Sequence, residues 1–216
     1  MRAVRKFPPG IGRNTQGIVM QPLNEKTIRA SFINASRQEA KKLTLPENFN
    51  SLDWESLEYL GWRDPKMPQR GYMIYTNANG ETRGLLLRAT EGARKAGSAA
   101  MCEMCRDVTL PCAVGMFTTR RSGQAGRDGD TLGTLLCTRF ECSANVRIAP
   151  PKDPINPDPM VVVAQRIIQL DERVNSFIER VYRARGGAGH FAPLHRHHLP
   201  CRTAFRMGRL SRNRII

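Results

Sequence analysis

The sequence lacks any run of about 18 apolar residues, which a membrane-spanning helix would need, and its N-terminus lacks the apolar stretch of a secretory signal. We therefore expect a cytoplasmic protein with no membrane partner. Aromatic residues are scarce, at 6%, but the hydrophobic content of 40% and the charged content of 25% are ordinary for a globular protein. A length of 216 residues allows one domain with extensions or two small domains.

Acidic residues are missing from both ends of the chain. Residues 1–19 contain four basic side chains and residues 184–216 contain seven, with no acid in either range. These two flanks carry most of the net charge of +15, so residues 20–183 are only mildly basic. The distribution predicts three parts: a disordered N-terminal extension over 1–19, a folded domain over 20–183 and a disordered Arg/His-rich tail over 184–216.

Histidine is absent from residues 20–183, because all four histidines lie in the tail. The expected folded domain therefore cannot form a Ser-His or Cys-His nucleophile, nor a catalytic zinc site with three histidines. The phosphate-binding motif GxxxxGK[ST] is also missing. These absences favour a binding protein over an enzyme, with no catalytic residues and no small-molecule substrate.

The patterns that are present predict an α+β fold. Asn24 is a candidate N-cap for a helix over about 24–42, and apolar spacing predicts a closing helix over about 160–183. Asn-Gly at 79–80 lies between two apolar runs and predicts a hairpin. The remaining expectations are short turns over 52–65, a hairpin of 113–119 with 131–136, a flexible cationic loop over 120–130 and an extended proline-rich connector over 150–159.

Four of the six cysteines form two close pairs, Cys102 with Cys105 and Cys137 with Cys142. Two closely spaced thiolates can face one tetrahedral Zn²⁺, and a second pair at a helix start completes its ligands. We therefore expect one structural Zn²⁺ at these four residues. Buried reduced thiols and a disulfide or redox pair are the alternatives. Cys112 follows a proline and is interpreted as a small core residue.

Arginines cluster around the expected metal module. Arg120, Arg121 and Arg127 lie in the loop over 120–130, and Arg139 and Arg147 lie near the second cysteine pair. They could form a basic patch that meets an acidic protein surface or the phosphates of RNA. A solvated polar face is the alternative, and composition does not choose among the three.

Several separated motifs, taken in order, resemble one family. They are MQPL at 20–23, IRASF at 28–32, LGWRDP at 60–65, GQAGR at 123–127, Gly-Thr at 133–134, and the segment from Cys137 through Cys142 to Arg147. Together these motifs look like the treble-clef zinc-finger domain of the elongation factor G-binding proteins, the FusB-type fusidic-acid-resistance group. The resemblance covers about 20–183 and leaves both flanks outside it. An over-extended start and a shifted reading frame are our hypotheses for these flanks.

The resemblance implies a bacterial protein with a Cys₄ treble clef that binds elongation factor G, plausibly at the ribosome. In the resistance proteins, this binding helps to release the factor from ribosomes trapped by fusidic acid. Cys102, Cys105, Cys137 and Cys142 take the family's zinc-ligand positions. Arg120, Arg121, Arg127 and Arg139 are our candidates for contacting the factor. The resistance proteins also carry an N-terminal helical bundle that this chain does not match. A zinc-containing RNA-binding protein, with the ribosome or rRNA as partner, is the alternative.

Overall fold

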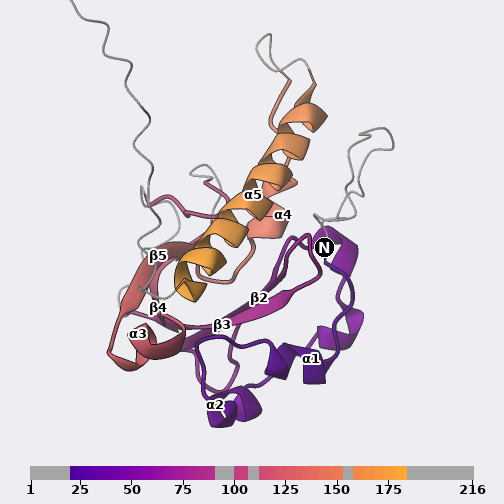
Figure 1. Ribbon diagram of the computed structural model, residues 1–216. Helices are drawn as coiled ribbons and strands as arrows, with labels where there is room; N and C mark the ends of the chain where they lie inside the picture. The colour runs from indigo at the N-terminus through magenta and orange to yellow at the C-terminus, as the bar shows by residue number, and fades with distance from the viewer. Residues whose placement is uncertain (1–19, 91–99, 107–111, 153–157, 184–216) are drawn as a thin grey trace, which may run out of the picture. The chain divides into compact units, whose positions relative to one another are not determined.

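The structure is a computed structural model that describes residues 20–90, 100–106, 112–152 and 158–183. Both predicted flanks and the centre of the proline-rich connector lie outside these residues. The described part contains a five-stranded antiparallel sheet in the order β1-β2-β3-β4-β5, with helices on both of its faces (Figure 1). This arrangement confirms the predicted α+β class. None of the described helices combines the length and the apolar character needed to cross a membrane.

The two predicted hairpins form most of the sheet. β2 (Arg70–Thr76) pairs with β3 (Thr82–Ala89), and Gly80 adopts a φ of +79° in the turn between them. β4 (Val114–Arg120) pairs with β5 (Thr131–Cys137) over their full lengths. The edge strand β1 (Leu60–Arg63) lies in the segment for which sequence predicted turns. Two short 3₁₀ helices, Phe49–Ser51 and Trp54–Ser56, precede it.

The predicted helix over 24–42 is wrong as a single element, because the structure has two short helices there. α1 (Glu25–Ala30) begins at the predicted cap Asn24, whose side chain accepts from the backbone of Thr27. α2 (Arg37–Lys42) starts at a capping box formed by Ser36 and Glu39. Between the two helices, Phe32 forms a β-bridge with Gly84 of β3. This pairing with the sheet takes the backbone groups that a continuous helix would need.

Helices α1 and α2 cover one face of the sheet, and the long helix α5 (Pro159–Tyr182) covers the other (Figure 1). Ile28 of α1 packs with Trp62, Tyr72, Ile74 and Leu86 on the first face. The core on the opposite face is larger and contains α5, the inward side chains of the strands and the cysteine pairs. Each strand alternates its side chains between these two cores. The predicted helix over 160–183 is therefore confirmed.

The loop over 120–130 is more ordered than the sequence predicted, since it contains the helical turn α3 (Gly123–Arg127). Arg121 donates to the carbonyls of Arg180 and Arg183, and the backbone of Ser122 donates to Val181. These donors satisfy carbonyl groups at the C-terminal end of α5, which have no partner within the helix. The loop is thus held in place by the end of α5.

Candidate metal centre

The first cysteine pair lies on a tight turn that docks against β5. Cys102 Sγ accepts from the backbone N–H of Met104 at 3.4 Å, and the N–H of Arg106 closes the turn onto the carbonyl of Cys102 at 2.9 Å. Arg106 has a positive φ of 52°. The N–H of Glu103 also donates to the carbonyl of Leu135 at 2.9 Å, so the turn is fixed to the sheet.

The second pair spans the end of a strand and the start of a helix. Cys137 is the last residue of β5, and Cys142 is the first residue of α4 (Cys142–Val146). Phe140 bends the chain between them with a positive φ of 59°. The sequence prediction that the second pair stands at a helix start is therefore confirmed. The β4–β5 hairpin supplies most of the long insertion between the two pairs.

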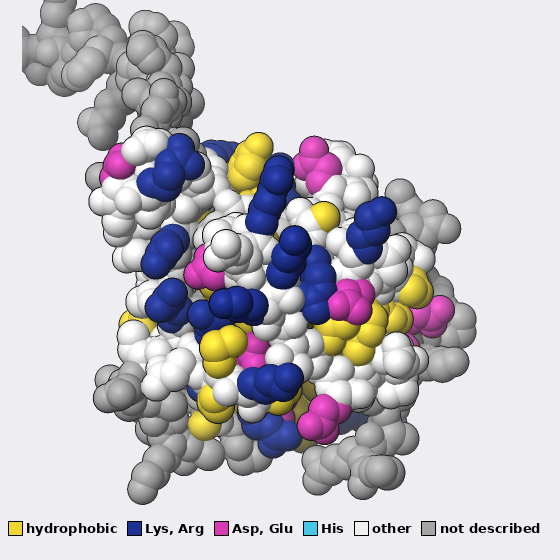
Figure 2. Space-filling view, turned by 90° about the horizontal axis from the view of Figure 1, so that it is seen from below, with side chains coloured by type: hydrophobic (Ala, Val, Ile, Leu, Met, Phe, Trp, Pro, Cys, Tyr) yellow, Lys and Arg dark blue, Asp and Glu magenta, His cyan; other side chains and the backbone are white. Residues whose placement is uncertain are grey.

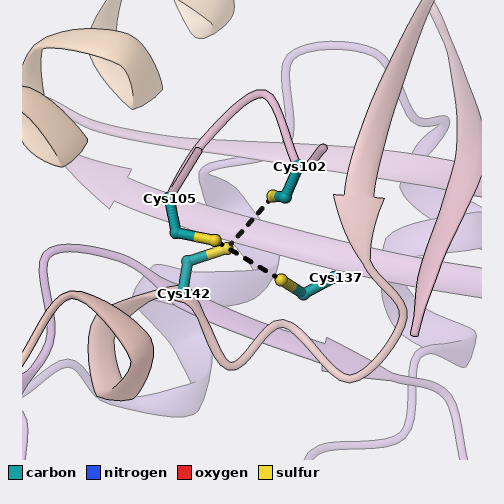
Figure 3. Close-up of side chains that lie close together, drawn as sticks. All are labelled: Cys102, Cys105, Cys137 and Cys142. Carbon is teal, nitrogen blue, oxygen red and sulfur yellow. Dashed lines mark hydrogen bonds between the residues drawn. The ribbon is translucent and has the colours of Figure 1, made fainter. Parts of the chain in front are cut away.

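The four sulfurs point toward one centre (Figure 3), and all of them lie within 4.8 Å of one another. The distances from Cys102 to Cys142 and from Cys105 to Cys137 are both 3.6 Å. Zinc–sulfur bonds of about 2.3 Å in a tetrahedron place neighbouring sulfurs about 3.8 Å apart. The observed spacing therefore fits a tetrahedral ion with four thiolate ligands.

The electrostatics of the cluster also call for a cation. Cys102, Cys137 and Cys142 have no exposed surface, and Cys105 is 6% exposed. Hydrogen bonding with Cys102 raises the pKa of both Cys137 and Cys142, and burial adds to this effect. Four thiolates packed together without water are unfavourable unless a positive charge compensates for them. A divalent ion supplies that charge, and its binding releases the thiol protons.

A buried amide completes the surroundings of the sulfurs. Nδ2 of Asn145 on α4 lies 3.5 Å from the sulfur of Cys137 and 3.9 Å from that of Cys105. Such outer donors orient metal ligands and offset part of their negative charge. Asn145 gave no signal in the sequence, because one asparagine in a polar segment does not reveal which side chain it will face.

The family model for the FBP C-terminal treble-clef zinc-finger matches residues 27–181, which include all four cysteines and well over half of the chain. The chain belongs to this family. Its four-cysteine cluster is accordingly a structural zinc site. The resemblance found in the motifs is confirmed by the family match.

The structure of the fusidic acid resistance protein FusC is similar at 21% sequence identity, with a TM-score of 0.39. The similarity covers 61% of this chain and 53% of the FusC chain, so this chain spans about half the length of FusC. A comparison with curated proteins returned no match.

The treble clef is held against the rest of the domain by one buried ion pair and one partly buried hydrogen bond. Arg147, at the end of α4, forms an ion pair of 2.7 Å with Glu58, which precedes β1. The guanidinium of Arg173 on α5 donates to the carbonyl of Met104 in the cysteine turn. These contacts hold the zinc finger against both the sheet and α5. Arg147, which the sequence placed in a basic patch, therefore has a partner in the core.

Cys112 lies beside the metal ligands without being one of the four. Its sulfur is 3.7 Å from that of Cys137, and it also lies 3.6 Å from Nδ2 of Asn145. The residue is half-buried and packs against the main core, as the sequence predicted. Burial raises the pKa of its thiol. Cys112 thus contacts both the four clustered cysteines and the hydrophobic core.

The candidate contact arginines of this zinc finger do not gather in one patch. Arg120 ends β4, Arg121 binds the end of α5 and Arg127 ends α3. Arg139 lies in the turn between Cys137 and Cys142, where its side chain is 81% exposed and its Nε is 3.4 Å from Glu141. Strand β5 separates Arg139 from the other three arginines, and its seven residues span about 20 Å. The four residues therefore belong to two surfaces.

Proposed function

We propose that this protein is a binding protein that docks on translation elongation factor G through its zinc finger, and that it promotes release of the factor from the ribosome. Membership of the family and the motif resemblance to elongation factor G-binding proteins support this proposal. The observation that supports the proposal most directly is the buried cluster of four cysteines, which is fixed to both the sheet and α5. A rigid, preformed surface lowers the entropic cost of binding a partner.

A binding role also agrees with the chemistry of the metal site. Four sulfur ligands fill the tetrahedral shell of a zinc ion, which leaves no position for a reacting water. The described residues contain no histidine that could act as a base, since all four histidines lie at 190 or beyond. The zinc ion would thus shape the docking surface and take no part in a reaction.

Arg139 is our candidate for the contact at the zinc finger. Its side chain projects from the turn between Cys137 and Cys142 with 81% exposure, and it forms an exposed ion pair with Glu141 at 3.4 Å. Exposed ion pairs contribute little to stability, so Arg139 can exchange Glu141 for an acidic partner group at small cost. Arg127, at the other end of the β4–β5 hairpin, provides a matched comparison.

The experiment is capture of elongation factor G by the full-length protein from a nuclease-treated extract. We expect retention of the factor by the wild type, and at least about tenfold weaker binding by Arg139→Glu, equivalent to about 1.4 kcal/mol. Arg127→Glu makes the same charge reversal, and this variant should bind the factor as the wild type does. Failure of the wild type to retain the factor would refute the docking proposal. Equal weakening by both variants would refute the assignment to Arg139.

The release step has its own test. Ribosomes stalled with elongation factor G and fusidic acid are incubated with the protein and then sedimented. We expect the factor to move into the supernatant with the wild type and to stay on the ribosome with Arg139→Glu. Binding without release would limit the proposal to docking.

A further inference from the structure

The sheet carries an unusual cluster of like charges on the face that α1 and α2 only partly cover. Arg70 of β2 stands directly opposite Arg88 of β3 in the antiparallel register, so both side chains project from the same face. Arg88 in turn lies opposite Thr118 of β4, and Arg120 follows two residues later on that face. Like charges directly opposite each other destabilise a sheet. Three arginines from neighbouring strands thus converge at a cost to folding.

One acidic side chain, that of Glu39, lies against this cluster. Glu39 of α2 lies 3.9 Å from the guanidinium of Arg88, and nearby Arg120 and Arg70 also stabilise its charge. The pKa of Glu39 is lowered, first by a hydrogen bond from the backbone of Ser36. The same carboxylate also accepts the backbone hydrogen bond of the capping box of α2, so it does not serve the arginines alone. Glu39 can therefore balance only one of the three arginine charges.

Two of these arginines, Arg88 and Arg120, border a hollow of the size of a small anionic group. Its volume is about 150 Å³, and its lining includes Arg88, Arg120, Thr118, Thr131 and Glu39. A water molecule occupies about 30 Å³ in the liquid, so the hollow has room for a phosphate group. Guanidinium groups and threonine hydroxyls are both common partners of phosphate oxygens.

The positive charge continues beyond the hollow. Figure 2 shows Lys and Arg side chains spread over the side of the molecule that carries α1 and α2, with fewer acidic side chains between them. Arg37 and Lys41 of α2 are both exposed and line a second hollow between α2 and α1. We call Arg37, Lys41, Arg70, Arg88 and Arg120 together the cationic face.

We propose that the cationic face binds the phosphate backbone of double-stranded RNA. Protein interfaces usually have several apolar anchors at their centre. Among the described residues, Met116, at 41% exposure, is the large apolar side chain exposed on the uncovered part of this sheet face. Single-stranded RNA is bound mainly by stacking on exposed aromatic rings. The one exposed aromatic side chain in the described part is Tyr182, on α5. Cations with hydroxyls suit the backbone of a duplex.

This binding site is separate from the one proposed for elongation factor G. Arg120 pairs with Thr131 at one end of the β4–β5 hairpin, whereas Val114 pairs with the zinc ligand Cys137 at the other end. The two proposals therefore predict that different variants lose binding, and either proposal can be refuted without the other.

The test measures binding of the full-length protein to a labelled RNA duplex of about 20 base pairs, over a range of salt concentrations. The double variant Arg88→Gln/Arg120→Gln removes two phosphate contacts. We expect it to bind about 60-fold more weakly at about 0.1 M salt, and to lower the salt slope of log K by about 1.8. Its thermal midpoint should stay the same or rise, because one charge opposite Arg70 has been removed.

The matched control is Lys152→Gln/Arg180→Gln, which removes two exposed positive charges that are not part of the cationic face; Arg180 lies on α5, which covers the other face of the sheet. We expect this control to keep RNA binding within about threefold of the wild type. Equal weakening of both variants would overturn the proposal, since it would indicate attraction by net charge alone. Wild-type affinity of the Arg88/Arg120 variant would also overturn it. If the Arg88/Arg120 variant lost binding to elongation factor G and kept binding to RNA, the result would overturn the proposal and assign the cationic face to an acidic protein partner.

Discussion

The buried ion pair between Glu58 and Arg147 offers a direct test of how the zinc finger is fixed to the sheet. The Glu58 side chain has no exposed surface, and that of Arg147 is 9% exposed. Besides the 2.7 Å ion pair, Arg147 donates to the second carboxylate oxygen at 3.0 Å and to the carbonyl of Ser143 at 2.8 Å. The Ser143 hydroxyl lies 3.3 Å from the backbone nitrogen of Glu58, which donates to it. One charge pair thus joins α4 to the chain entering β1.

We expect Arg147→Met to lower the free energy of unfolding by about 3–5 kcal/mol, because it leaves a carboxylate buried without a counter-charge. For a domain of this size, that loss corresponds to a fall of about 10 °C in the thermal midpoint. The double variant Glu58→Gln/Arg147→Met removes both charges, so it should recover a large part of the loss. Denaturant unfolding followed by circular dichroism, with zinc in excess, measures all of these values.

The comparison of single and double variants separates the buried charge from simple loss of packing. If Arg147→Met costs less than about 1 kcal/mol, or if the double variant is as unstable as the single one, the account of this ion pair is refuted. Zinc content is measured on each variant, so that loss of the metal is not mistaken for loss of the ion pair.

Three further predictions concern the metal, the sheet and the pH dependence. Cys137→Ser should abolish stoichiometric zinc binding and loosen the treble clef, as measured by elemental analysis and near-UV circular dichroism. Gly71→Ala should cost about 1–3 kcal/mol of unfolding free energy, because its new Cβ would lie 2.6 Å from the ring of Phe140. Burial raises the pKa of Asp171 to about 6 from a usual 3.8, so the folded state binds the proton more tightly. The contribution of Asp171 to stability therefore falls as pH rises from about 4 to about 6. The thermal midpoint of Asp171→Asn should rise relative to that of the wild type over this pH interval.

Each of these predictions has a control and a result that would contradict it. Cys112→Ser changes the neighbouring sulfur outside the set of four, so it should keep the zinc. Unchanged zinc content in the Cys137 variant would contradict the ligand assignment. Gly133→Ala places a Cβ 3.4 Å from Met116 and should be tolerated better than the change at Gly71. A midpoint difference between Asp171→Asn and the wild type that does not vary with pH would refute the titration of Asp171.

Local chemistry made much of this fold predictable. The Asn-Gly turn, the cap at Asn24 and the apolar spacing of α5 all act within a few residues, so each is visible in the sequence. The cluster of four cysteines was predicted in the same way, because thiolate pairs at close spacing are typical of a structural zinc site in a small domain. The strand β1 and the turn α3 were missed, since neighbouring strands and the end of α5 stabilise them.

The sequence by itself determined the α+β class, both hairpins and the identity of the four cysteines whose sulfurs lie within 4.8 Å of one another. Only the tertiary structure decided that the helix over 24–42 breaks at Phe32, that Arg147 pairs with Glu58, and that Arg120 and Arg139 lie on different surfaces. The physical reason is distance along the chain. Caps, turns and metal knuckles join residues that are close in sequence, whereas sheet register and buried charge pairs join residues that meet only after folding.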